Sequence, residues 1–85
     1  MKAFMYTIKS PVGLHARHAG LLVKETSRFQ SDVTVSKGEK KVNGKGILSL
    51  MGLGVKQGDL IALSVEGPDE DFAAQQLKAF LWTNF

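Results

Sequence analysis

Apolar and polar residues alternate along three stretches of the chain, and a period of two is typical of a β-strand. The alternation predicts strands over residues 2–8, 32–36 and 61–65. The sequence Lys37-Gly38-Glu39-Lys40 predicts a hairpin turn after the second of them, with a short return strand over residues 41–43. The chain therefore contains four strands for one small sheet.

Three other stretches are predicted to be helical. The first helix begins at Ala16 and fades near Phe29, because apolar residues recur there at helical spacing. Its inward face is expected to be formed by Ala16, Ala19, Leu22, Val23 and Thr26. A short helix is predicted over residues 47–51, ended by the glycines that follow it. The last helix starts within residues 67–71, where a proline in the first turn and three acids favour a helix N-terminus, and runs to about Trp82.

The order of these elements, β-α-β-β-α-β-α, predicts a two-layer sandwich in which helices cover one apolar face of a sheet. With 85 residues the chain is expected to be a single domain over residues 1–85, which excludes a two-domain enzyme, a barrel or a repeat array. No stretch approaches the roughly 18 apolar residues of a membrane span, and no secretory signal is apparent. A cytoplasmic protein that does not insert into membranes is the expectation.

The composition of the chain limits the kinds of site that it can form. The chain has no cysteine and only two histidines, so a disulfide framework and a structural zinc site are excluded, and we expect no metal. Residues 1–56 carry ten Lys or Arg against three Asp or Glu, whereas residues 57–85 carry one Lys against five acids. This asymmetry indicates a basic face that meets an anionic partner, although a merely solvated surface remains an equal alternative.

The segment from Gly13 to Ala19 carries the candidate chemistry. A glycine turn places His15 at the predicted start of the first helix, and Arg17 follows within the first turn. Unpaired N–H groups and the helix dipole attract an anion there, and arginine adds a forked, charged donor. An imidazole at this position is suited to covalent capture of a phosphoryl group. The alternative is a histidine that only caps the helix or contacts the core.

The sequence Gly13-Leu14-His15-Ala16-Arg17 resembles the phosphohistidine signature of the HPr family of the bacterial sugar phosphotransferase system. Residues 42–54 resemble the second-helix region of that family, and residues 65–70 its last strand-to-helix turn. Length, element order and motif position also fit, so the resemblance covers essentially the whole chain. It implies an α+β open-faced sandwich, with a four-stranded antiparallel sheet covered by three helices.

The resemblance also implies a mechanism. His15 would take a phosphoryl group on Nδ1 from phosphorylated enzyme I and pass it to a IIA-type component. Arg17 would help to neutralise the phosphoryl charge during transfer. Such a protein is a phosphoryl carrier rather than a free-standing enzyme; it needs no cofactor or metal and is expected to be a monomer.

A partner-docking surface is expected beside His15. Five large apolar residues crowd into residues 47–53, and a short surface helix cannot bury all of them, unless it sinks unusually deeply into the fold. With the resemblance, the residues expected to contact partners are Gly20, Lys24, Lys45, Ile47, Leu48 and Met51, with Lys56 extending a basic rim. Lone lysines are also commonly no more than solubilising charges.

Two positions depart from the family pattern. The family usually has proline after the arginine, where this chain has His18, which we expect to tune the site unless it is a tolerated surface substitution. Many Gram-positive members carry a regulatory serine where this chain has Gly46, so serine-directed control is expected to be absent. Two other functions are alternatives. A regulatory protein that docks a transcription factor or a metabolic enzyme has no need of a nucleophile, and for nucleic-acid binding the basic region lacks stacking aromatics.

Overall fold

The computed structural model describes residues 1–85 and contains four strands and three helices. The strands are β1 (Lys2–Thr7), β2 (Asp32–Lys37), β3 (Lys40–Asn43) and β4 (Leu60–Glu66), and the helices are α1 (Ala16–Thr26), α2 (Ile47–Gly52) and α3 (Glu70–Asn84). Their order along the chain is β1, α1, β2, β3, α2, β4, α3, as the sequence predicts. The expected α+β open-faced sandwich is confirmed.

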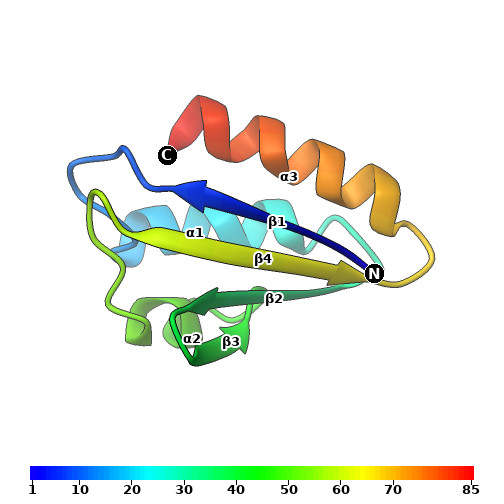
Figure 1. Cartoon of the computed structure of the whole chain (residues 1–85), viewed down its shortest axis with the longest axis horizontal. Coiled ribbons are helices and arrows are strands. Elements are labelled where there is room, and N and C mark those ends of the chain that lie inside the picture. Colours follow the sequence, from blue (N-terminus) through cyan, green and yellow to red (C-terminus); the bar gives the residue numbers. More distant parts are fainter.

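The strands form one antiparallel sheet in the order β1-β4-β2-β3. Its register places Phe4 opposite Leu63 and Leu63 opposite Val35, so one row of apolar side chains crosses three strands. Figure 1 shows α1 passing behind the sheet, with α3 alongside β1 and α2 close to β3. Alternate residues of the central strands, such as Ser64, point away from this covered side and remain half-exposed.

The layer between sheet and helices contains a core of 18 buried apolar residues. Val35, Ile61 and Leu63 from the sheet and Leu22 and Leu77 from the helices are all fully buried. Burying each such side chain contributes roughly 1.5–3 kcal/mol, which is the main force that holds α1 and α3 against the sheet. No helix combines the length and the hydropathy needed to cross a lipid bilayer.

Helix α1 is shorter and more exposed at its start than the sequence predicts. It ends at Thr26, because the N–H groups of Arg28 and Phe29 donate three residues back, to Glu25 and Thr26, and tighten the chain out of the α-helix. This turn carries the Phe29 side chain into the core, where it is buried. The expectation that Ala16 belongs to the inward face is wrong: it is exposed, because the first turn of α1 projects beyond the core.

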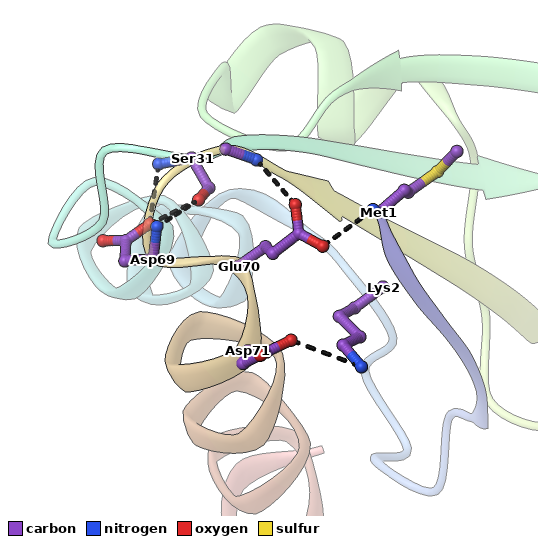
Figure 2. Close-up of polar contacts among 7 residues, drawn as sticks. Met1, Lys2, Ser31, Asp69, Glu70 and Asp71 are labelled. Carbon is purple, nitrogen blue, oxygen red and sulfur yellow. Dashed lines mark hydrogen bonds and ion pairs between the residues drawn. The ribbon is translucent and has the colours of Figure 1, made fainter.

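Helix α3 begins at Glu70, within the predicted segment 67–71. The expectation that Pro68 lies in its first turn is wrong: Pro68 lies in the preceding turn, where the Glu70 N–H donates to the Gly67 carbonyl. Asp69 is the N-cap residue, but its carboxylate does not cap the helix. It accepts hydrogen bonds from Ser31 instead, as Figure 2 shows. The start of α3 is thereby tied to the residue that precedes β2.

Candidate functional site

The loop between β1 and α1 holds His15 in place at the start of the helix. Gly13 has a φ of 61°, and a Cβ at this position would overlap the Val55 carbonyl oxygen, so only glycine fits. The next residue, Leu14, is buried, and its N–H donates to the same Val55 carbonyl at 3.2 Å. His15 follows in extended conformation as the N-cap residue of α1, and its side chain is exposed.

The His15 imidazole caps the helix. The backbone N–H of Arg17 donates to Nδ1 of His15 at 3.3 Å, and the Ala19 N–H donates to the His15 carbonyl at 2.8 Å. Nδ1 therefore presents its lone pair to the first turn, so that the proton of the neutral ring is on Nε2. The capping role that the sequence left open is confirmed, and it is compatible with a nucleophilic role because the ring is exposed.

Arg17 brings an unpaired positive charge to the same turn. Its side chain is exposed, and its guanidinium takes part in none of the ion pairs of the structure, in contrast to Arg28, which pairs with Glu25 at 2.7 Å. The N–H groups at the start of α1 also have no acceptor within the helix. This end of α1 thus combines helix N–H donors with a charged, forked donor, which is suited to an anion such as a phosphoryl group.

His18 lies in the first turn of α1, and its side chain is half-buried. Its ring centroid is 5.2 Å from that of His15 and 5.1 Å from that of Phe85, in edge-on arrangements. The Nδ1 atom of His18 is buried and has no hydrogen-bond partner. The contact between His18 and Phe85 joins the first turn of α1 to the residue that follows α3, so the sequence could not have indicated it.

Helix α2 exposes an apolar face. Leu50 and Leu53 are buried, whereas Ile47, Leu48 and Met51 are 43%, 83% and 39% exposed. The interpretation that part of this helix faces away from the core is confirmed, and the alternative of a deeply sunken helix is wrong. Helix α2 packs against α1, and the space above Gly20 in α1 is open. We call Gly20, Ile47, Leu48 and Met51 the apolar patch.

Two further apolar residues, outside the apolar patch, are exposed and were not predicted to be. Val12, in the loop that leads to His15, is 47% exposed, and Leu21, next to Gly20 in α1, is 42% exposed. Leu21 lies outside the inward face that the helical spacing of α1 defines, so this spacing could have predicted its exposure. For Val12 the only signal was its place in the turn before the candidate nucleophile.

The lysines differ in their environments. Lys24 and Lys56 are exposed and unpaired, as expected for a basic rim. Lys45 is half-buried, and its ammonium donates to the Phe29 carbonyl at 2.7 Å, beyond the end of α1. Lys45 therefore also has a structural contact, which the sequence did not indicate. Gly46 is the N-cap residue of α2 and supplies no side-chain cap.

No cluster of three or more His, Asp or Glu side chains is arranged to hold a metal ion. The groups that meet at the start of α1 are the His15 imidazole, the Arg17 guanidinium and the backbone N–H groups. Their arrangement favours reversible binding or covalent capture of a small anion at His15.

Comparisons with known proteins identify the family. A family model described as "PTS HPr component phosphorylation site" matches residues 2–82. A relative from Lysinibacillus sphaericus, named phosphocarrier protein HPr, is 44% identical over 81 residues, which cover 95% of this chain and 92% of the relative. An HPr-like protein Crh from Halalkalibacterium halodurans is 45% identical over 74 residues, covering 87% of this chain and 88% of that protein.

A solved structure agrees with the sequence comparisons. The crystal structure of HPr-C-His from Thermoanaerobacter tengcongensis superposes with a TM-score of 0.93 at 44% identity, over 98% of this chain and 93% of that one. The similarity thus extends over the whole fold and is not confined to the residues around His15. The chain belongs to the HPr family of phosphocarrier proteins.

Proposed function

We propose that this protein accepts a phosphoryl group on Nδ1 of His15 from phosphorylated enzyme I and passes it to a IIA-type component of a sugar phosphotransferase system. The observation that carries the proposal is the position of His15: an exposed imidazole whose Nδ1 lone pair faces the N-terminus of α1. This function places the protein in the cytoplasm and makes it a carrier that enzymes load and unload.

The transfer step follows from this geometry. The Nδ1 lone pair attacks phosphorus and forms the N–P bond, while the bond between phosphorus and the donor breaks and its electron pair leaves with the donor. The Arg17 N–H, which donates to Nδ1 in the unmodified protein, then faces the new phosphoryl group. This N–H, the dipole of α1 and the Arg17 guanidinium stabilise the added charge. Positioning and electrostatics supply most of the rate, as in other phosphoryl transfers.

The apolar patch would be the surface that enzyme I and the IIA-type component contact. Exposed apolar side chains in α2 supply area for burial, and Lys24 and Lys56 provide unpaired positive charge for acidic partner surfaces. Charges of this kind mainly speed the encounter, so that transfer should slow as the salt concentration rises.

The test is to incubate the protein with enzyme I and phosphoenolpyruvate and to measure its intact mass at alkaline and at acid pH. We expect one phosphoryl group, stable in alkali and lost in acid. The matched control is His15→Asn, because asparagine keeps an acceptor at the N-cap of α1 and removes the nucleophile. Labelling of the His15→Asn variant, or no labelling of the wild type, would overturn the proposal.

A second candidate is a regulatory protein that docks a transcription factor or a metabolic enzyme without carrying phosphoryl flux. The apolar patch suits docking, and the relatives include an HPr-like protein named Crh beside the phosphocarriers, but the comparisons do not favour this candidate. It gives no role to the nucleophile at the start of α1. In the experiment above, it predicts a folded wild type that takes up no phosphoryl group.

A further inference from the structure

Four aromatic rings form a continuous row from His15 to α3. The centroid of the His18 ring is 5.2 Å from that of His15, with an interplanar angle of 68°, and 5.1 Å from that of Phe85, with an angle of 65°. Phe85 in turn lies 5.9 Å from Phe80. These separations and angles are those of favourable edge-on ring contacts. His18 is the link between the candidate nucleophile and the rest of the row.

Phe85, the third ring of this row, is firmly held. The Phe85 side chain is only 4% exposed, and its carbonyl accepts hydrogen bonds from the N–H groups of Lys9 and Ser10, at 2.6 Å and 2.8 Å. Lys9 and Ser10 begin the loop that leads to His15. Phe85, which packs against the His18 ring, is thus hydrogen-bonded to the segment that leads to the nucleophile.

His18 is not anchored through its buried nitrogen. Its Nδ1 atom has no hydrogen-bond partner, and an unpaired polar atom in the interior costs stability. The buried Nδ1 atom therefore contributes no hydrogen bond that would stabilise the fold. The contacts that the structure gives to this ring are those with the rings of His15 and Phe85.

The His15 ring has little else to restrain it. It is exposed, and its one hydrogen bond, from the Arg17 N–H at 3.3 Å, is slightly beyond the usual range for such bonds. Exposed side chains change rotamer within picoseconds to nanoseconds. A neighbouring ring that occupies one side of the imidazole removes part of this freedom, which favours reaction because the reacting atoms are already oriented.

We propose that His18 is a positioning residue, whose ring holds the His15 imidazole in the orientation in which Nδ1 faces the first turn of α1. The inference deepens the proposed function and its kinetic part depends on that function. His18 acts through ring contact and not through its nitrogens, so that another aromatic ring can replace it.

The test compares His18→Ala, His18→Phe and the control Phe72→Ala. Phe72 is a half-exposed ring in an edge-on contact with Phe29, at the other end of α3 from the site. We expect His18→Ala to lower the transfer rate at saturating carrier about tenfold with little change in the half-saturating concentration. His18→Phe should recover most of this loss, and Phe72→Ala should leave the rate unchanged.

A second readout needs no phosphoryl donor and therefore separates this inference from the proposed function. In NMR spectra of the unmodified protein, His18→Ala should broaden the distribution of His15 ring orientations and shift its ring nitrogen signals, and His18→Phe should restore both. His15 ring signals unchanged in His18→Ala would overturn the inference. A loss in His18→Phe as large as in His18→Ala would overturn it too, because it would assign the effect to the nitrogens.

Discussion

Nδ1 of His15 has two roles in the proposed function. It is the acceptor that caps α1, and it is the atom we propose as nucleophile. The hydrogen bond that caps the helix therefore also orients the lone pair, and the same N–H group faces the product. Phosphorylation would replace a neutral acceptor by charged oxygens, which a helix N-terminus binds more favourably.

The capping role can be measured separately from the chemistry. We expect His15→Ala to lower the free energy of unfolding by about 0.5–1 kcal/mol, because the first turn of α1 loses its side-chain acceptor. His15→Asp should be about 1 kcal/mol more stable than His15→Ala, since a carboxylate caps the helix and complements its dipole. Urea denaturation at neutral pH gives both values. Equal stability of the wild type and His15→Ala would show that the hydrogen bond from the Arg17 N–H to Nδ1 does not stabilise the fold.

Helix α2 shows how one element divides its residues between the core and the surface. Leu50 is fully buried and Leu48 is 83% exposed, although both occur in a six-residue helix. The helix is therefore anchored by one side chain while another is exposed on the surface.

Substitution by alanine should affect stability at Leu50 and partner binding at Leu48. We expect Leu50→Ala to lower the free energy of unfolding by about 2–5 kcal/mol, because it leaves a cavity in the core. Leu48→Ala should change it by less than about 0.5 kcal/mol, yet raise the carrier concentration needed to half-saturate enzyme I. Urea denaturation and the enzyme I transfer assay measure the two effects. A Leu48→Ala variant with unaltered half-saturation would remove Leu48 from the docking surface.

Element type and order could be predicted from the sequence, because strand alternation and helical spacing reflect local burial. The end of α1 could not, since the bonds of Arg28 and Phe29 that close it depend on where Phe29 finds space in the core. At the site, the glycine turn and the helix start predicted the position of His15. The contact of His18 with Phe85 joins residues 67 positions apart and depends on the tertiary fold alone.

At the scale of the whole molecule, three segments far apart in the sequence meet at one end of the sheet (Figure 2). Asp69 accepts hydrogen bonds from the Gln30 and Ser31 N–H groups, at 3.0 Å and 2.9 Å, and from the Ser31 hydroxyl. Glu70 pairs with the Met1 amino group at 2.7 Å. These contacts join the starts of β1 and α3 to the residue before β2.

The hydrogen bond from the Ser31 hydroxyl, followed by that from the Gln30 N–H, holds the pKa of Asp69 below its ordinary value of 3.8. Because the pKa of Asp69 is lowered in the folded protein, the stabilisation that its carboxylate provides depends on pH. A carboxyl whose pKa is lower in the folded than in the unfolded protein stabilises the fold fully above its unfolded pKa, and this stabilisation is lost as the pH falls through the folded pKa. We expect Asp69→Asn to unfold at a lower urea concentration than the wild type at pH 7, with a gap that shrinks between about pH 5 and pH 2. Asp71→Asn is the matched control, because it removes a carboxylate from the same turn but no bond to Ser31; it should retain the acid sensitivity of the wild type. A gap of constant size over this pH range would mean that the bonds of Asp69 do not depend on its charge.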